Sequence, residues 1–195
     1  MGYTPQKKAL KKKQPSSPVA GEIRSQWAQK RPVVFFVLGF ALLMVVFYAI
    51  LLSDYFQNNI QVKVMSVYAV ISSFILNIFG METIATSGWI RAPQFSISIA
   101  RGCDALEAMA LFASALLTFP AQWKHKLAGL GVGLAVLYLL NVVRIVSLYL
   151  IGLYFPKAFE FMHVEVWQGI FIIFALALWI FWIRWTRKEK VHAAQ

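Results

Sequence analysis

Long apolar blocks separated by short polar segments dominate this chain. The clear blocks lie at residues 33–52, 104–119, 127–153 and 165–184. A helix needs about 20 predominantly apolar residues to cross a bilayer, and these blocks approach or exceed that length. The pattern predicts an all-α polytopic membrane protein with about four transmembrane helices. The glycines in GLGVG, at 129–133, have the small-xxx-small spacing that is typical of close helix packing.

Residues 60–80 are harder to assign, because they are moderately apolar but carry Lys63, further polar side chains and Gly80. Short cytoplasmic loops of membrane proteins are rich in Lys and Arg. The loop at 121–126 and the tail after Trp185 are both basic. A fifth crossing would put either these segments or the basic N-terminus on the outer side. We therefore expect 60–80 to form an interfacial or re-entrant helix on the outer side.

A short extended segment precedes the single cysteine of the chain. Within residues 95–100 (FSISIA), large apolar side chains alternate with small ones. This is the period-two pattern of a half-buried strand. Outside the bilayer, such a strand would support the loop that follows it or pair with an extended peptide. A plain connector is an equally open reading.

The composition supports a membrane protein. Hydrophobic residues make up 59% of the chain, the mean hydropathy is +0.64 and 14% of residues are charged, against about a quarter in soluble domains. The net charge of +11 is concentrated at the two ends, where it suits anionic lipid headgroups. We predict a basic, disordered cytoplasmic N-terminus over 1–31, a transmembrane domain over 32–185 and a basic cytoplasmic tail over 186–195. With no soluble domain predicted, the bilayer rather than nucleic acid is the expected partner.

The chain has one cysteine, Cys103. A single cysteine excludes an intramolecular disulfide, and with it a redox mechanism that uses two thiols of the same chain. Cys103 and the histidines of the chain show no metal-ligand spacing. We therefore expect neither a metal nor another cofactor.

Three reactive side chains fall on the same predicted face of the membrane. Cys103 opens the second clear apolar block, Arg144 lies in the outer part of the third, and His163 lies in the loop before the last. Ionisable residues in or beside spanning segments are functional candidates, and a thiol, a guanidinium and an imidazole suit acyl transfer. Two plainer readings stay open: Cys103 as a small buried hydrophobe, and Arg144 in a structural salt bridge with Asp104 or Glu107.

The residues around Cys103 act on its thiol in opposite directions. The preceding glycine, the expected start of a helix and the neighbouring Arg101 favour the thiolate. Asp104 and Glu107 raise the thiol pKa if they are ionised. The sequence leaves this balance open.

Asn141 lies three residues before Arg144 on the same predicted helical face, and we expect it to orient the guanidinium. The remaining histidines contrast with His163. His125 falls in the basic cytoplasmic loop and His192 in the tail, so both are expected to be bystanders.

The order of these motifs resembles the exosortase/archaeosortase family. An RGC-x-x-x-E segment, an N-x-x-R-I segment and a later loop histidine follow one another across helical blocks. The resemblance covers residues 33–185, and the short length is similar to the compact exosortase H type. It implies that Cys103 is the nucleophile, Arg144 the anion-stabilising group and His163 the proton carrier. Many exosortases read Cys-Ser-Gly where this chain reads Cys-Asp-Ala, which leaves the subtype and the shape of the loop open.

The resemblance also implies a function. Such proteins are membrane-embedded cysteine transpeptidases, which cleave C-terminal sorting signals of exported proteins at the outer face of the plasma (inner) membrane and transfer them to an acceptor. The implied partners carry a short motif, a transmembrane helix and a basic end. Two other readings remain, a non-enzymatic membrane scaffold and a small transporter component. A transporter is expected to show repeats or interrupted helices, and we find no convincing case of either.

Overall fold

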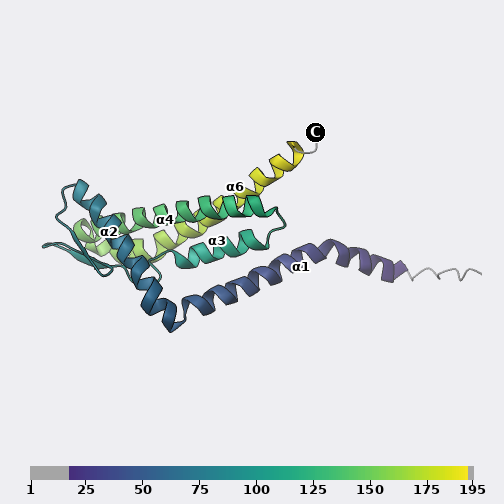
Figure 1. Ribbon diagram of the computed structural model, residues 1–195, viewed down its shortest axis with the longest axis horizontal. Coiled ribbons are helices and arrows are strands. Elements are labelled where there is room, and N and C mark those ends of the chain that lie inside the picture. The colour runs from purple at the N-terminus through teal and green to yellow at the C-terminus, as the bar shows by residue number, and fades with distance from the viewer. Residues whose placement is uncertain (1–17, 193–195) are drawn as a thin grey trace, which may run out of the picture. The chain divides into compact units, whose positions relative to one another are not determined.

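The computed structural model describes residues 18–192, with side chains described for 30–187, and it is mainly helical (Figure 1). The chain divides into two compact units, residues 1–38 and 39–195, and the candidate site lies in the second. The helices are α1 (Pro18–Leu51), α2 (Val62–Ile78), α3 (Leu106–Thr118), α4 (Trp123–Tyr154), α5 (Phe159–Phe161) and α6 (Trp167–His192). The strands are β1 (Ile84–Thr86), β2 (Trp89–Arg91) and β3 (Ser96–Ser98). Two π-helices, η1 (Phe56–Gln61) and η3 (Met162–Val166), and a 3-10 helix, η2 (Pro156–Ala158), complete the described elements.

Helices long and apolar enough to cross a membrane confirm the predicted fold class, an all-α polytopic membrane protein. In the described part of the chain there are four, Lys30–Leu51, Phe56–Ile78, Trp123–Tyr154 and Pro156–Arg187. This set differs from the expected one, because it includes α2 with η1 and leaves out α3.

The apolar block around α3 is shorter as a helix than as a sequence pattern. α3 has 13 residues, which at 1.5 Å per residue is about 20 Å, against about 30 Å for the hydrocarbon core. It begins only at Leu106, because the two residues after Cys103 form a turn. It ends before Phe119, which is extended with a ψ of 136°, as residues that precede a proline usually are.

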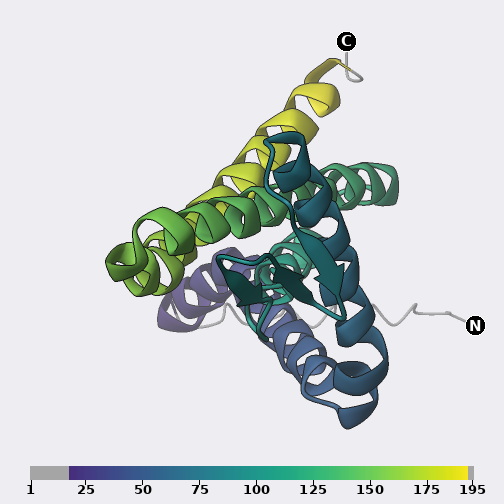
Figure 2. The same ribbon diagram turned by 90° about the vertical axis from the view of Figure 1, so that its left-hand side faces the viewer.

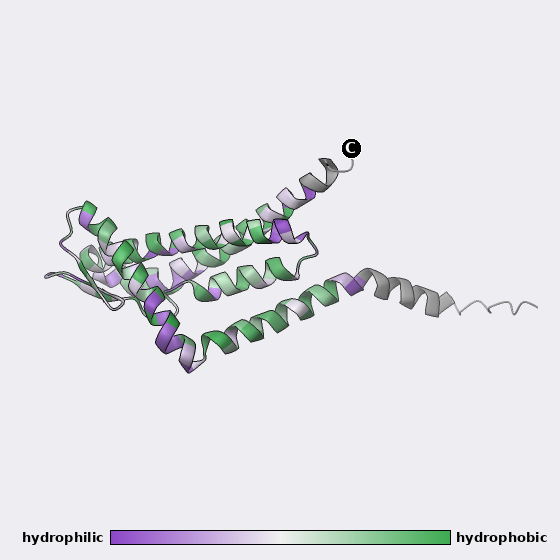
Figure 3. Cartoon of the chain, in the orientation of Figure 1, coloured by the Kyte–Doolittle hydropathy of each residue, from purple (hydrophilic) through white to green (hydrophobic). Residues whose placement is uncertain are grey.

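α2 packs on the half of α4 that carries the candidate site. Tyr68 stacks on Tyr138 with ring centroids 4.7 Å apart, and buried residues of α2 share a hydrophobic cluster with Val142, Ile145 and Tyr149 of α4. In Figures 1 and 2, α2 crosses α4 obliquely near the end that bears the sheet. The segment formed by η1 and α2 begins with hydrophilic residues, whereas hydrophobic residues dominate α3 and α4 (Figure 3). The interfacial or re-entrant helix remains a prediction, because the length and composition of this segment also permit a crossing.

α1 begins at Pro18 rather than after Pro32, so residues 18–31, which we expected to be disordered, are helical. Proline suits the first turn of a helix, where its missing N–H would have no intrahelical partner. The segment that follows is rich in Ala, Gln, Lys and Arg, which favour helix. The rest of the predicted disordered segment, residues 1–17, lies outside the described residues.

The strands form an antiparallel sheet in the order β1-β2-β3. The first hairpin turns at Ser87 and Gly88, whose φ angles are 46° and 83°, as a type I′ turn requires. β3 confirms the strand predicted from the alternation. β1 and β2 were missed, because residues 84–91 show no such alternation of large apolar and small side chains. Ile90 is buried and Ile97 partly buried in the cluster with α2 and α4, so the sheet is anchored on these helices.

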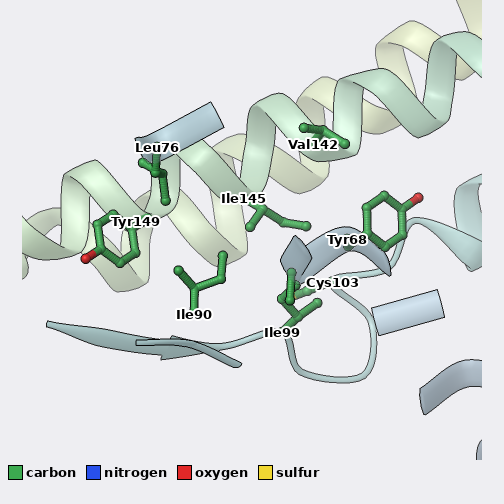
Figure 4. Close-up of a cluster of buried hydrophobic side chains, with 9 residues drawn as sticks. Tyr68, Leu76, Ile90, Ile99, Cys103, Val142, Ile145 and Tyr149 are labelled. Carbon is green, nitrogen blue, oxygen red and sulfur yellow. The ribbon is translucent and has the colours of Figure 1, made fainter. Parts of the chain in front are cut away.

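Two hydrophobic clusters hold this unit together. One joins α2, the sheet and the second half of α4, and it includes Cys103 next to Ile99 (Figure 4). The other joins α3, α4 and α6. Its close packing depends on the predicted small residues, since a Cβ at Gly129 would overlap Trp182 and one at Gly133 would overlap Phe112.

Candidate active site

Cys103 lies in a tight turn that connects β3 to α3. Its N–H donates to the carbonyl of Ala100 at 3.0 Å, and Gly102 before it has a φ of 84°. Ala105 adopts the left-handed conformation with φ 59°, which is uncommon for a residue with a side chain. The helix starts only at Leu106. Cys103 therefore precedes the helix, whereas we had expected it to be at the start of the helix.

Ala105 explains where this chain departs from the Cys-Ser-Gly motif. The position that is glycine in that motif is the one that needs a positive φ here. Glycine populates this region without steric cost. The backbone at this position therefore suits the glycine of the Cys-Ser-Gly motif, but in this chain the residue is alanine.

His163 contacts the thiol directly. Its Nε2 lies 2.7 Å from the Sγ of Cys103, and the ring stacks on Phe159 with centroids 5.6 Å apart, which fixes its orientation. His163 lies in the π-helix η3, not in the loop that we predicted. π-helical turns are rare and frequently occur at functional sites.

Arg144 joins the other two groups. Although it lies within α4, its side chain is only 7% exposed. The Nη2 atom is 3.8 Å from the Sγ of Cys103 and donates to the carbonyl of His163 at 3.3 Å, while the guanidinium lies over the ring of Phe171 at 5.5 Å. The plainer reading made Asp104 a salt-bridge partner of Arg144, but its carboxylate accepts hydrogen bonds from Gln61 and from the N–H of Leu106 instead. The guanidinium is therefore directed at the thiol.

Asn141 holds the main chain of the nucleophile turn. It is fully buried, and its Nδ2 donates to the carbonyl of Cys103 at 3.0 Å. We expected this amide to orient Arg144. It lies on the same helical face, one turn before that residue, but it bonds the backbone of Cys103 instead.

Asp104 is 1% exposed and is bonded on both oxygens. Gln61 donates to Oδ2 at 2.6 Å and the N–H of Leu106 donates to Oδ1 at 3.2 Å. Gln61, in the π-helix η1, was missed by the sequence analysis. A lone glutamine in a polar stretch carries no distinguishing signal, and only the fold brings it next to the nucleophile turn.

The other predicted site residues lie outside this group. Arg101 and Glu107 are exposed and border a cavity that also reaches Cys103, but in the described part of the chain neither bonds Cys103, Arg144 or His163. His125 lies in the first turn of α4, 19 residues before Arg144, which corresponds to about 28 Å along the helix. Its carbonyl accepts from Trp182 at 2.8 Å. His192 is the last residue of α6.

A family model matches most of this chain. The family model described as transmembrane exosortase (Exosortase_EpsH) matches residues 27–183. The chain belongs to the exosortase family. Neither a curated protein nor a solved structure matches it. Membership in this family supports a general role as a membrane transpeptidase in protein sorting, and with the apolar helices it shows a multi-pass membrane protein.

The electrostatics of this exosortase favour a protonated nucleophile at rest. Burial raises the pKa of the Cys103 thiol, the Arg144 guanidinium lowers it, and the Asp104 carboxylate raises it again, with a net upward shift. The sequence alone leaves this balance open. A thiol with a raised pKa needs a base to become a nucleophile, and the imidazole at 2.7 Å is placed to act as one.

Two cavities of the exosortase meet at the thiol. One, of about 530 Å³, is bordered by β3, α4 and α5. The other, of about 380 Å³, is bordered by the end of α1, by α3 and by α6. Cys103, Arg144 and His163 line both cavities. A polypeptide that passes from one to the other would cross the nucleophile.

Proposed function

We propose that this exosortase is a membrane-embedded cysteine transpeptidase. It cleaves the C-terminal sorting signals of exported proteins and transfers the cleaved protein to an acceptor nucleophile. The main support is the contact of 2.7 Å between the Sγ of Cys103 and the Nε2 of His163, with Arg144 beside both. A nucleophile, a base within hydrogen-bond reach and a fixed cation together suit covalent acyl transfer.

The first half-reaction forms a thioester. His163 takes the proton of the Cys103 thiol, and the sulfur attacks the carbonyl carbon of the scissile peptide bond. The carbonyl oxygen becomes an oxyanion, which the Arg144 guanidinium stabilises, a contribution of about 3 kcal/mol in comparable sites. The C–N bond then breaks, and His163 returns its proton to the leaving amine.

The second half-reaction releases the protein from the enzyme. The acceptor nucleophile attacks the thioester carbonyl while His163 takes its proton. The C–S bond breaks, and the proton returns to the sulfur, which restores the thiol of Cys103. Water in place of the acceptor would give hydrolysis by the same steps.

The proposed site faces the exterior of the plasma (inner) membrane, and both termini are cytoplasmic. The supporting observation is the distribution of charge. Lys124 and Lys126 lie at the start of α4 and the basic residues of α6 at its end, whereas Arg144, Cys103 and His163 lie towards the other end of α4. Basic residues mark cytoplasmic ends.

The deciding experiment replaces the nucleophile in cells. An exported reporter that ends in a short motif, a transmembrane helix and a basic segment should be processed by the wild-type protein. Cys103→Ser should abolish processing while the variant stays inserted at wild-type abundance. Ser53→Ala, at an exposed serine outside the site, is the matched control and should process normally. Continued processing by Cys103→Ser would reject the transpeptidase and favour a scaffold or a transporter component.

A further inference from the structure

β3 has an edge that pairs with no strand of the described structure. It is the last strand in the order β1-β2-β3, and its register places Ile97 opposite Ile90. The N–H of Ala92 donates to Phe95 at 3.0 Å and that of Ile99 donates to Gly88 at 2.9 Å. These two bonds show which backbone groups of this segment point towards β2.

The directions of the remaining backbone N–H and C=O groups of β3 follow from the regular alternation along a strand. In an antiparallel pair, every second residue directs both its N–H and its C=O at the partner strand. Residues 95, 97 and 99 face β2 in this register, so the N–H and C=O of Ser96 and Ser98 face away from it. Both serines are exposed. An edge of this kind is a template for a further strand.

β3 and the residues that follow it border the larger cavity at the nucleophile. All residues from Ser96 to Ala100 border the cavity of about 530 Å³ that also contains Cys103. Ile145, Leu148 and Gly152 of α4 also border this cavity, as do Phe159 and Glu160. Figure 4 shows the end of this strand segment, at Ile99, next to Cys103. The strand that carries the unpaired backbone groups therefore borders the same cavity as the thiol.

α4 holds the strand in this position. A Cβ at Gly152 would overlap the ring of Phe95, so the absence of a side chain there lets the ring lie on the helix. The same ring packs edge-on against Tyr149 with centroids 5.5 Å apart. The edge is thus fixed to the helix that also carries Arg144.

We propose that the substrate segment immediately before the scissile bond binds as a fourth strand along the free edge of β3. The proposal rests on the proposed function and adds how the substrate is held. The other cavity is bordered by the apolar helices α1, α3 and α6, which suits the hydrophobic helix that follows the scissile bond. We therefore assign the extended segment before the scissile bond to the cavity that β3 borders.

Two properties of the bound segment follow. β3 runs towards Cys103, and a segment that ends at the scissile carbonyl must also run towards Cys103, so the two strands are parallel. Every second side chain of a strand points to the same side, and the apolar side chains of Ile145 and Leu148 border this cavity. Recognition therefore combines main-chain hydrogen bonds with apolar side chains at every second position.

The test uses the full-length protein and a probe that needs no knowledge of the natural signal. Acetyl-tetra-alanyl chloromethyl ketone alkylates the thiol by displacing chloride, and chloroacetone carries the same reactive group without a peptide. We expect the peptide probe to label Cys103 at least about tenfold faster, the equivalent of one or two net hydrogen bonds. N-methylation of the probe should slow labelling at every second residue only, because alternate amides face β3.

Variants of the two sheet edges give the matched comparison. Ser98→Pro removes an outward N–H, which an edge strand tolerates, and should slow the peptide probe about tenfold while leaving chloroacetone unchanged. Ser98→Ala keeps the N–H, and Ala85→Pro changes the opposite edge strand, so both should label as wild type. If Ser98→Pro also alters the chloroacetone rate, the N-methyl series on wild-type protein decides.

Equal tolerance of N-methylation at all positions would overturn the proposal. So would wild-type labelling of Ser98→Pro by the peptide probe. Labelling does not require turnover, so the two hypotheses fail separately. If N-methylation slows labelling equally at every position while processing still depends on Cys103, only the strand addition is rejected. If N-methylation slows labelling at alternate positions while Cys103→Ser still processes the reporter, only the transpeptidase is rejected.

Discussion

The buried amide of Asn141 donates a hydrogen bond of 3.0 Å to the main-chain carbonyl of Cys103. One turn further along α4, Arg144 reaches the sulfur of the same residue. A single helix therefore holds both the backbone and the side chain of the nucleophile. A helix is a more precise support for such a site than a loop, which matters because the turn that bears Cys103 has no regular structure of its own.

Arg144→Lys should abolish most processing although it keeps the positive charge. The Nη2 atom of the planar guanidinium contacts both the Cys103 sulfur and the His163 carbonyl, and the compact, rotatable ammonium group of lysine does not hold a nitrogen in this fixed position. We expect a loss close to that of Arg144→Ala, measured as the fraction of reporter processed at equal protein abundance. Near-wild-type processing by the lysine variant would show that charge alone suffices.

His163→Ala should slow processing by roughly 10²- to 10⁴-fold, the usual contribution of a general acid–base group. His125→Ala is the control, because that residue lies at the other end of α4 and its hydrogen bond to Trp182 uses the backbone carbonyl. A thioester on Cys103 should accumulate in the His163 variant and be visible by mass spectrometry. Similar losses in the two variants would remove His163 from the mechanism.

The positions of Cys103, Arg144 and His163 could be anticipated because topology is simple in a membrane protein. Each is a reactive group near the end of an apolar block. The positions of the basic segments predict that these ends lie on one side of the membrane. The structure brings the three together, and their catalytic roles remain predictions. The fold class followed from the lengths of the apolar blocks, and the strand before the cysteine followed from its period-two alternation.

Other features were hidden because they depend on contacts between distant segments. Gln61 reaches Asp104 across 43 positions of the chain, and nothing in the polar stretch around it marks that residue. The start of α3 was set too early because hydropathy does not reveal a turn made by Asp104 and Ala105. Whether α2 crosses depends on its packing against α4, which a hydropathy pattern does not contain.

Ala105→Gly should stabilise the protein without loss of processing. Ala105 has a φ of 59°, and a side chain in this region is strained by about 1 kcal/mol or more, so glycine should raise the unfolding temperature in detergent. Ala108→Gly, inside α3, should lower it, because glycine costs about 1 kcal/mol in a helix interior. Destabilisation by Ala105→Gly would show that burial of the methyl group outweighs the backbone strain.

Asp104→Asn should lower the pKa of the Cys103 thiol. The ionised carboxylate raises that pKa, so its neutralisation moves the pH midpoint of iodoacetamide labelling to lower pH. Asparagine retains an acceptor for Gln61, which limits the structural change. Glu107→Gln removes an exposed carboxylate and should leave the midpoint where it was. A midpoint that rises in Asp104→Asn would mean that its hydrogen bonds outweigh its charge.

The last prediction concerns α2. Its start lies beside the nucleophile turn through the bond between Gln61 and Asp104. Its end is joined to the sheet that leads to Cys103, through Thr83, which bonds Ser73 and Asn77. Both ends are thus tied to the segment that carries the thiol, so we expect α2 to remain on the outer side.

Single cysteines in a Cys103→Ser background test this arrangement with a membrane-impermeant maleimide. Asn58→Cys, Glu82→Cys and Lys157→Cys are exposed positions and should all label from outside intact cells. Lys124→Cys should label only after the membrane is opened, because it lies at the basic start of α4. Labelling of Asn58→Cys and Glu82→Cys from opposite sides would show that α2 crosses. The basic N-terminus would then lie outside, or the 121–126 loop and the tail would, against the positive-inside tendency on which the four-span topology rests.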